Sequence, residues 1–379
     1  MDGGELSVPY LSFITSSRND DHGENMFVRM QATVSSAITQ MERNKLKSEV
    51  ILVDYNPPPD RPLLKDALAF PRKTSHCSVR SIIVPNSVHR QYPDSGKLNF
   101  NGSVAQNVGI RRARGRFIVC TPVDILFSNE LVRFVVEQGL REDRLYRADR
   151  LDVAKEAVEI QDLDERLRFC SENVIRIYSR DGTIPVLRRK KHHFRSQNLN
   201  LDMGNKKIPR LHFNASDLLL MSKTAWHSMH GFPEMDCISL ASDSLINFMA
   251  YFIGVREEIL PEPCRIYHVD HDYPWRDKVT EHVLSKILFY CFHDKIALRM
   301  RRSLVLAKRC FMKHILRKDS ARKCPLKECG ISNVNMSKLW QIVFEMKEGK
   351  RPVAYNDAAW GLRDENLEQY FVVKAAWES

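Results

Sequence analysis

Polar side chains with chemical potential follow three apolar runs of the sequence. Arg18, Asn19 and Asp20 come after the run at 10–17, Asp54 follows the run at 50–53, and Asp124 follows the run at 116–120. If these runs are parallel strands of one open sheet, their carboxyl ends meet at one edge, where such sheets bind ligands. Carboxylates, an amide and a guanidinium at that edge suit a nucleotide together with a divalent cation.

The elements that must position these residues alternate along the chain. Short apolar runs at 10–17, 50–53, 79–84 and 116–120 indicate buried strands, and apolar residues at helical spacing indicate helices at 26–45, 102–113 and 128–138. This alternation is typical of an α/β fold with a mostly parallel sheet covered by helices on both faces. The polar segment 180–210 has no steady period and reads as an inserted loop.

Other nucleotide-binding classes leave signatures that this sequence lacks. Neither GxGxxG nor GxxxxGKS occurs, which argues against an NAD-dependent enzyme and against a P-loop nucleotidase. The segment SSRNDDHG is a poor version of the glycine-rich, basic loop of nucleotidyltransferases.

Composition places the chain among ordinary globular proteins and makes its charge local. Of 379 residues, 43% are hydrophobic and 28% are charged, with a net charge of +11. The segment 295–327 carries twelve Lys or Arg against the single acid Asp319, so the rest of the chain is balanced. Apolar residues interleave with these cations, and such a helix can lie on an anionic membrane surface. A solvated helix face is the simpler alternative, and nucleic acid has no supporting motif.

The nine cysteines show no metal-binding spacing, and several lie inside apolar runs. With no secretory leader pattern and no run of about 18 apolar residues, we expect a cytoplasmic protein that at most attaches peripherally to a membrane.

A family resemblance rests on the order of several short motifs. SRNDD, ILVDYNPP and the series Asn107-x-Gly109-x₃-Ala113-x-Gly115 lead into Asp124; RLYRADRLDV, GFPE, Asp243 and IYHVDH follow. Together they resemble the GT-A fold glycosyltransferases of the family 2 type over about residues 8–275. The resemblance implies a GT-A-like, Rossmann-type mixed sheet flanked by helices in residues 1–276. A nucleotide-sugar half would span about 8–150 and an acceptor half about 151–276, followed by a helical, basic C-terminal region at 277–379.

The resemblance also implies a metal site that departs from the family pattern. The first Asp of the family's Asp-x-Asp motif is Pro122 here, so Asp124 alone remains, and His271 is the residue implied as an additional ligand. The implied ion is Mn²⁺ or Mg²⁺, holding the diphosphate of a UDP- or GDP-sugar. The alternative is that no metal binds and that basic side chains of 188–195 neutralise the leaving diphosphate.

The remaining roles are carried over position by position. Asp243 is implied as the base of an inverting transfer to a hydroxyl of a glycan or lipid-linked acceptor. Asp54, with Arg18 and Asn19, is implied to contact the nucleoside, Asn107 the sugar-phosphate and Asp217 the donor sugar. The alternatives are a retaining hexosyltransferase on the same fold, or an inactive module that binds a nucleotide sugar or a membrane.

Overall fold

The chain of the computed structural model divides into two units, and the described residues all belong to the first. The first comprises Met1–His271 with Asn333–Ser379, and the second Asp272–Ser332. The described residues are 8–20, 25–93, 95–137, 139–180, 182–186, 211–212, 217–235, 242–271 and 336–378. Two regions singled out in the sequence, the basic segment 295–327 and the loop 188–195, lie outside these residues.

The first sheet has eight strands, and its centre is the parallel sheet that the apolar runs predict. Four strands are parallel neighbours in the order β4-β1-β2-β3, and β10 and β13 extend them antiparallel on either side. The full order is β11 (Arg256–Ile259), β6 (Arg144–Arg147), β10 (Leu219–Ser222), β4 (Phe117–Cys120), β1 (Leu11–Ser17), β2 (Ser48–Tyr55), β3 (Cys77–Val84), β13 (Gln369–Val373). The predicted α/β class is therefore confirmed, with a mixed sheet.

The second sheet has five strands, all of which follow Asp124 in the sequence. Only β12 and β7 run parallel in it; the other neighbours are antiparallel. Its order is β5 (Ile125–Phe127), β12 (Arg265–Val269), β7 (Asp149–Val153), β8 (Val174–Ser179), β9 (Gly182–Pro185). Because β5 begins directly after Asp124, the chain passes from the first sheet to the second at the residue expected to hold a cation.

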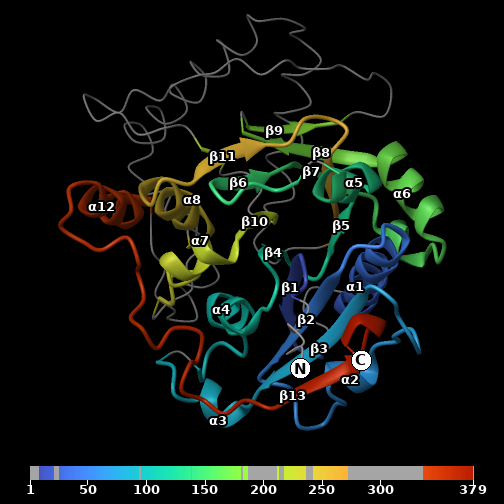
Figure 1. Cartoon of the computed structure of the whole chain (residues 1–379), viewed down its shortest axis with the longest axis horizontal. Helices are drawn as coiled ribbons and strands as arrows, with labels where there is room; N and C mark the ends of the chain where they lie inside the picture. Colours follow the sequence, from blue (N-terminus) through green and yellow to red (C-terminus); the bar gives the residue numbers. More distant parts are fainter. Residues whose placement is uncertain are drawn as a thin grey trace, which may run out of the picture. The chain divides into compact units, whose positions relative to one another are not determined.

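Helices cover both faces of the first sheet. Successive residues of β1 point to opposite faces, so Phe13 packs with the apolar stripe of α1 (Met26–Arg43), while Ile14 packs with α4 (Gly102–Arg112). Figure 1 shows these two helices beside the central strands. The other helices are α2 (Leu64–Ala67), α3 (Asn86–His89), α5 (Asn129–Glu137), α6 (Leu163–Glu172), α7 (Lys223–Ser228), α8 (Ser242–Phe252), α12 (Met336–Lys347) and the 3₁₀ turns Lys155–Glu159 and Ala376–Glu378.

The glycines of the family motif have a packing role. A Cβ on Gly109 would lie 2.5 Å from Cγ2 of Ile14, and a Cβ on Gly115 would lie 2.6 Å from the backbone nitrogen of Ser12. Both positions therefore exclude a side chain, because α4 and the start of β4 lie directly against β1. The helix itself begins at the cap residue Asn101, whose side chain accepts a hydrogen bond from the backbone of Val104.

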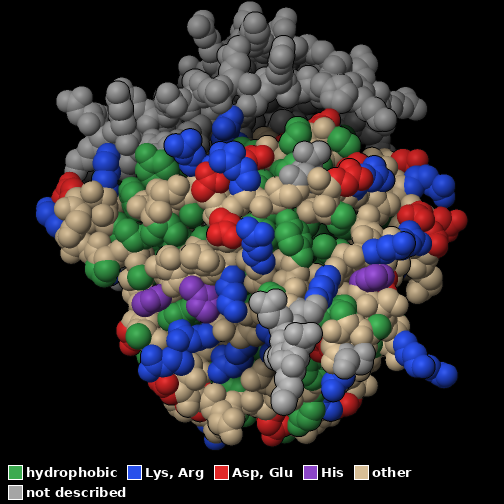
Figure 2. Space-filling model, in the orientation of Figure 1, with side chains coloured by type: hydrophobic (Ala, Val, Ile, Leu, Met, Phe, Trp, Pro, Cys, Tyr) green, Lys and Arg blue, Asp and Glu red, His purple; other side chains and the backbone are tan. Residues whose placement is uncertain are grey.

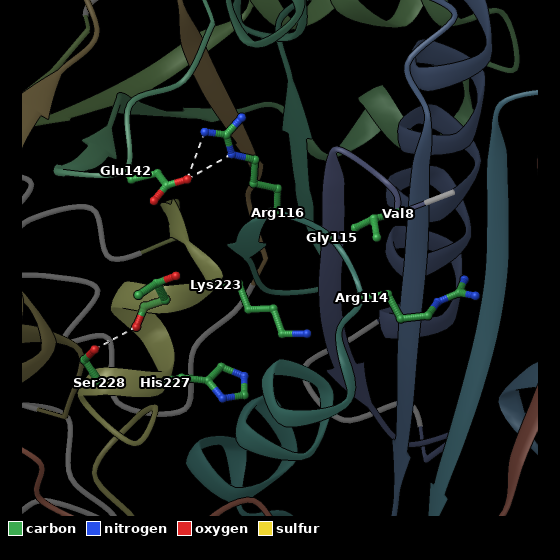
Figure 3. A pocket seen from close by; sticks show the side chains of 9 residues that line it. Val8, Arg114, Gly115, Arg116, Glu142, Lys223, His227 and Ser228 are labelled. Carbon is green, nitrogen blue, oxygen red and sulfur yellow. Dashed lines mark hydrogen bonds and ion pairs between the residues drawn. The ribbon is translucent and has the colours of Figure 1, made fainter. Parts of the chain in front are cut away.

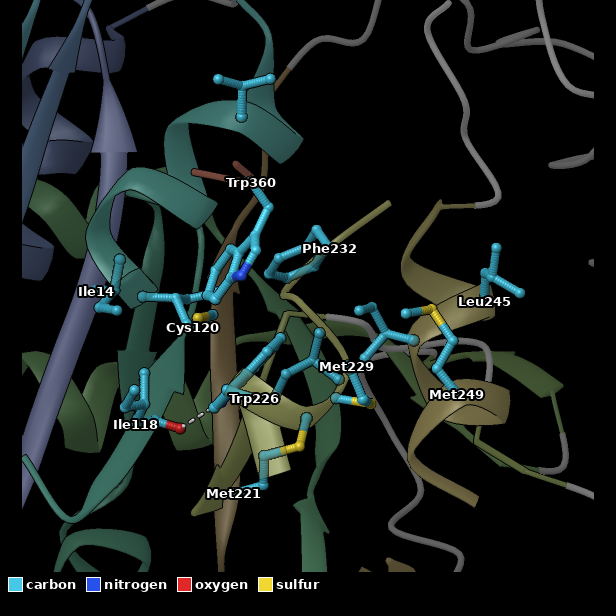
Figure 4. Close-up of a cluster of buried hydrophobic side chains, with 14 of the residues drawn as sticks. Ile14, Ile118, Cys120, Met221, Trp226, Met229, Phe232, Leu245, Met249 and Trp360 are labelled. Carbon is cyan, nitrogen blue, oxygen red and sulfur yellow. Dashed lines mark hydrogen bonds between the residues drawn. The ribbon is translucent and has the colours of Figure 1, made fainter. Parts of the chain in front are cut away.

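Figure 4 shows part of a buried core in which side chains of β4 and α7, among them Ile118 and Trp226, cluster with Met221, Met229 and Met249. Trp226 is fully buried and its indole Nε1 donates to the carbonyl oxygen of Ile118 at 3.2 Å. Trp226 and the α8 side chains Ile246 and Met249 are all fully buried. Their burial means that these side chains stabilise the fold and are not exposed for ligand binding.

The C-terminal part differs from the helical region that the sequence predicts for 277–379. The helix α12 agrees, but β13 is a strand that pairs antiparallel with β3 and completes one side of the first sheet. Among the described residues, no helix is long and apolar enough to cross a membrane. On the face drawn in Figure 2, acidic and basic side chains are interspersed over most of the described surface, as the charge balance outside 295–327 predicts.

Candidate functional site

Asp54 is the next-to-last residue of β2, at the carboxyl edge of the first sheet. It is fully buried beside Ser17 of β1, and its Oδ2 accepts a hydrogen bond from the backbone N–H of Leu64 at 2.8 Å. Its Oδ1 is buried with no hydrogen-bond partner among the described residues. Burial raises the pKa of Asp54 to about 6, and the Leu64 N–H and the charge of Arg18 offset only part of that effect. A buried carboxylate oxygen without a donor is a place where a ligand hydroxyl or N–H can bind.

Arg18 and Asn19 lie on the loop after β1. They directly follow Ser17, which is the register partner of Asp54. The Nη1 of Arg18 pairs with Asp20 at 3.1 Å, and its buried Nε has no hydrogen-bond partner among the described residues. Asn19 donates to the carbonyl oxygen of Pro62 at 3.0 Å, which ties this loop to the segment after β2. The predicted neighbourhood of Arg18, Asn19 and Asp54 is thus present at the sheet edge.

Two further buried polar atoms near this edge lack partners among the described residues. They are Oε1 of Gln106, on α4, and Oγ1 of Thr121, which directly follows β4. Buried polar atoms are nearly always hydrogen-bonded in folded proteins. Unsatisfied donors and acceptors near the ends of neighbouring strands make this edge a candidate for binding a polar ligand.

Asp124 forms the second part of the site, at the start of β5. Its Oδ2 lies 2.7 Å from Nη1 of Arg29 on α1, 3.5 Å from Nε2 of His268 on β12, and 3.4 Å from Nε2 of His271. Asp124, His268 and His271 each offer one ligand atom, and these atoms lie within 4.8 Å of one another. The predicted pair Asp124 and His271 is therefore brought together, and His268 joins it.

Electrostatics in this cluster favour charged forms despite burial. Burial alone would raise the pKa of Asp124, but His268, His271 and Arg29 hold it well below its ordinary value. Burial alone would lower the pKa of His268, yet the Asp124 carboxylate raises it above its ordinary value.

The donor set fits a divalent ion that accepts nitrogen ligands. Two imidazoles and one carboxylate suit Mn²⁺ and other transition ions, whereas Mg²⁺ prefers oxygen ligands throughout. Arg29 contacts the same Asp124 oxygen that an ion would use. The cluster thus already contains one fixed positive charge beside the carboxylate.

A row of charged side chains on the second sheet supports His268. In the strand register His268 lies opposite Asp152 of β7, and Asp152 lies opposite Arg176 of β8. Asp152 contacts His268, Arg176 and Arg150, and Arg150 also pairs with Asp217 at 2.9 Å. Asp217 is therefore connected to the Asp124 cluster through the side chains of Arg150, Asp152 and His268.

Sequence reasoning missed Arg29, Asp152 and the arginines of this row. The alternation Arg150-Leu-Asp152 places two charged residues on one face of a strand, and that was the available signal. Nothing in the pattern of the predicted helix 26–45 marks Arg29, because its partner is 95 positions away.

Asn107 has a role different from the expected contact with a sugar-phosphate. It is fully buried; its Nδ2 donates to the carbonyl oxygen of Phe232 at 2.8 Å and to Glu234 at 2.7 Å, and its Oδ1 accepts from the Phe232 N–H at 2.6 Å. These bonds use both N–H donors of the amide and one of the two lone pairs of its oxygen. Asn107 therefore joins α4 to the GFPE turn. Asp243 lies in the first turn of α8, and its side chain is outside what the structure describes.

A surface hollow of about 790 Å³ lies at the opposite, amino edge of the first sheet (Figure 3). Arg114, Arg116 and Lys223 line it, but Arg116 pairs with Glu142, and Arg114 pairs with Glu49 and Glu378. Its cations are thus largely neutralised, and it contains none of the predicted site residues.

Comparison with known proteins gives limited likeness. No family model matches the chain, and no curated protein matches it in sequence. Among solved structures, S. aureus TarS is 13% identical with a TM-score of 0.35, covering 69% of this chain and 37% of that one. S. aureus TarS 1–349 in complex with UDP-GlcNAc is 13% identical with a TM-score of 0.36, covering 70% and 59%. The chain thus spans about 37 to 60% of the length of these proteins, and a likeness this partial carries no conclusion about its activity.

Proposed function

We propose that this protein is a glycosyltransferase that moves a sugar from a nucleotide-diphosphate sugar to a hydroxyl acceptor. One observation carries the proposal: Asp54, with an oxygen that has no partner among the described residues, lies at the carboxyl end of β2, and Asp124, which joins His268 and His271 in one cluster, follows β4, whose carboxyl end lies at the same edge of the first sheet. Parallel α/β sheets bind nucleotides at this edge. The order of motifs that resembles family 2 enzymes supports the same reading.

In this proposal the nucleoside lies against β2. The Oδ1 of Asp54 accepts a hydrogen bond from a ribose hydroxyl or a base N–H, and the Nε of Arg18 donates to a ligand oxygen. Both atoms lack partners among the described residues, which is the support for these roles. Asn19 holds the loop 57–63 in place through its bond to Pro62.

Asp124, His268 and His271 would hold the divalent cation, with Mn²⁺ favoured over Mg²⁺ by the two imidazoles. The ion supplies positive charge that stabilises the leaving diphosphate. Arg29 adds a fixed cation next to Asp124 from its buried position on α1. If no ion binds, Arg29 is a source of neutralising charge beside Asp124, and the basic side chains of 188–195 remain the proposed alternative.

In the proposed inverting transfer, Asp243 at the start of α8 is the catalytic base. The acceptor oxygen attacks the anomeric carbon, the bond from that carbon to the phosphate oxygen breaks, and the acceptor proton passes to the Asp243 carboxylate. Its place in the first turn of a helix favours the ionised form of the carboxylate. Asp217 remains a proposed contact of the donor sugar, held by Arg150.

Diphosphate release tests the proposal. The protein is incubated with UDP- and GDP-sugars and Mn²⁺, with and without glycan or lipid-linked acceptors, and released nucleoside diphosphate is measured. We expect turnover that falls at least 100-fold in Asp124→Ala and in Asp243→Asn but is retained in Glu142→Gln, which changes an exposed ion pair. Equal turnover in all three variants would contradict the assignment.

A catalytically inactive nucleotide-sugar-binding module is the second candidate. Pro122 removes one acid of the metal motif, and the Arg29 ion pair already occupies an oxygen of the other. Binding of UDP or GDP without turnover across the whole panel would establish it. A retaining transferase would give turnover with the opposite anomeric outcome, which NMR of the product distinguishes.

Membrane attachment through 295–327 remains a separate proposal, carried by the twelve basic residues of that segment. Flotation with acidic liposomes at physiological salt tests it, with neutral liposomes as control. Failure to float with the acidic vesicles would remove the membrane from the proposal and leave the transferase activity untouched.

A further inference from the structure

Asp152 is a carboxylate with three charged partners beside the candidate site, and the proposed function gives it no role. It is fully buried on β7. Its Oδ1 lies 2.8 Å from Nε of Arg150 and 3.1 Å from Nδ1 of His268, and its Oδ2 lies 3.0 Å from Nε of Arg176. Three donors from three strands therefore converge on one carboxylate.

The backbone register explains why these groups meet. His268 of β12 pairs directly with Asp152, and Asp152 pairs directly with Arg176 of β8. Directly paired residues of neighbouring strands project from the same face and lie close enough for their side chains to touch. The contact of Asp152 with His268 is thus built into the sheet and does not depend on a loop.

The two nitrogens of His268 face different acids. Its Nδ1 lies beside Asp152, while its Nε2 lies 3.5 Å from Oδ2 of Asp124 and belongs to the cluster that includes His271. Arg150 also approaches Nδ1, at 3.3 Å, and a guanidinium can only donate, so an unprotonated Nδ1 would accept from Arg150 while a protonated Nδ1 has the Asp152 carboxylate as its acceptor. With its proton on Nδ1, the imidazole presents the Nε2 lone pair toward Asp124 and His271.

We propose that Asp152 is a positioning residue that fixes the ring of His268 and its tautomer, so that Nε2 serves as a cation ligand beside Asp124 and His271. The inference rests on the proposed cation site of the proposed function. A carboxylate that accepts from the remote nitrogen of a ligating histidine orients the ring and increases its basicity. Arg150 and Arg176 hold the two oxygens of Asp152 and thereby fix the acceptor.

A purely structural crosslink between β7, β8 and β12 is the competing interpretation. Both interpretations predict a loss of stability when Asp152 is changed, so stability cannot separate them. Only the positioning role predicts a change in cation affinity in a protein that remains folded.

The experiment measures Mn²⁺ binding to the full chain by electron paramagnetic resonance, without any sugar donor. Asp152→Asn retains an oxygen for Nδ1 but removes the charge, and we expect affinity to fall about 10- to 100-fold. His268→Ala should fall at least as far. Glu49→Gln is the matched control: Glu49 is also a fully buried carboxylate that pairs with two arginines, at the other edge of the first sheet, and its Mn²⁺ affinity should stay within about twofold of the wild type.

Unchanged affinity in folded Asp152→Asn would overturn the proposal, and so would unchanged affinity in His268→Ala. If Asp152→Asn does not fold, long-range proton–nitrogen NMR of the wild type decides, because a proton on Nε2 of His268 in place of Nδ1 would also overturn it. Wild type that binds Mn²⁺ but transfers no sugar refutes the proposed function and leaves this inference standing. Wild type that turns over donor in EDTA and binds no Mn²⁺ refutes this inference and leaves the proposed transferase activity standing.

Discussion

Glu49 and Asp54 lie on the same strand, β2, and both carboxylates are fully buried, yet their surroundings differ completely. Glu49, at the amino edge, accepts from Ser12 at 2.7 Å, from Arg80 at 2.8 Å and from both the backbone and the guanidinium of Arg114. Asp54, at the carboxyl edge, accepts from one backbone N–H and leaves an oxygen without a partner among the described residues.

The pKa values move in opposite directions as a result. Burial alone would raise the pKa of Glu49, but Arg80 and its other partners lower it below its ordinary value. Burial dominates at Asp54 and raises its pKa to about 6. A satisfied buried acid stabilises the fold, whereas an unsatisfied one destabilises it and is retained where a ligand can supply the missing donor. The comparison therefore assigns a structural role to the amino edge and supports the proposed binding site at the carboxyl edge.

The largest effect is expected for Glu49→Ala. Removing the acid leaves Arg80 buried and unpaired, which costs about 3–5 kcal/mol in the free energy of unfolding. Urea denaturation measures this, and nucleotide affinity of the folded protein should not change. Glu142→Ala, at an exposed ion pair, should cost less than about 1 kcal/mol. Similar losses of unfolding free energy in Glu49→Ala and Glu142→Ala would contradict the structural role assigned to Glu49.

The contribution of Asp54 to stability should depend on pH with the opposite sign to that of a paired acid such as Glu49, whose pKa is lowered. The folded pKa of Asp54, about 6, lies above the ordinary value of 3.8, so the folded state holds the proton between these values while the unfolded state has released it. Stability therefore falls as pH rises from about 4 to 6, by on the order of 3 kcal/mol from this residue.

Asp54→Asn removes that loss and isolates it from the other titrating groups. Unfolding free energies of the variant and the wild type, measured from pH 4 to 8, should diverge in favour of the variant as pH rises. Nucleotide affinity should meanwhile fall about tenfold in the variant, and in the wild type it should fall below pH 6. Parallel stability curves would show that Asp54 is satisfied after all.

Gly115→Ala tests the packing of the amino edge without touching charge. The new methyl group would lie 2.6 Å from the Ser12 nitrogen and 2.8 Å from the Leu11 carbonyl carbon, so backbone must shift. We expect a loss of about 1–3 kcal/mol in thermal or urea unfolding. Gly139→Ala is not a matched control because Gly139 has φ +64°; Gly96→Ala is matched, since no atom lies within 4 Å of its Cβ position.

The smallest effect is expected for Glu378→Gln. Glu378 accepts from Arg114 and from Ser78, and the amide oxygen of Gln keeps one acceptor while the charge is lost. A loss of about 1 kcal/mol should follow, and it should disappear in an Arg114→Ala background, because the charged partner is then absent. An undiminished loss in that background would remove Arg114 as the link between Glu49 and the C-terminal segment.

Local patterns in the sequence predicted the elements that are stabilised by nearby residues. The apolar runs at 10–17, 50–53, 79–84 and 116–120 form β1 to β4, and the periodic segments form α1, α4 and α5, because each buries a face whose period is visible in the letters. Asp54 and Asp124 were found for the same reason, since Asp54 directly follows the run 50–53 and Asp124 lies four residues after the run 116–120.

Contacts between distant residues were not predictable in this way. The pairing of β13 with β3, the ion pair of Arg29 with Asp124 and the row of His268, Asp152 and Arg176 all depend on strand order and register, which no local pattern specifies. Asn107 shows the same limit: its motif was visible, but its amide bonds to Phe232 and Glu234, 125 and 127 positions away.

The pairing of β13 with β3 has a consequence for biosynthesis. β3 is made early, and its partner strand emerges from the ribosome only after the whole of the intervening segment 85–368 has been synthesised. Until then the hydrogen-bonding side of β3 that β13 later covers stays open to solvent or to other chains. Nascent chains stalled before residue 369 should therefore engage chaperones more strongly than chains released beyond it.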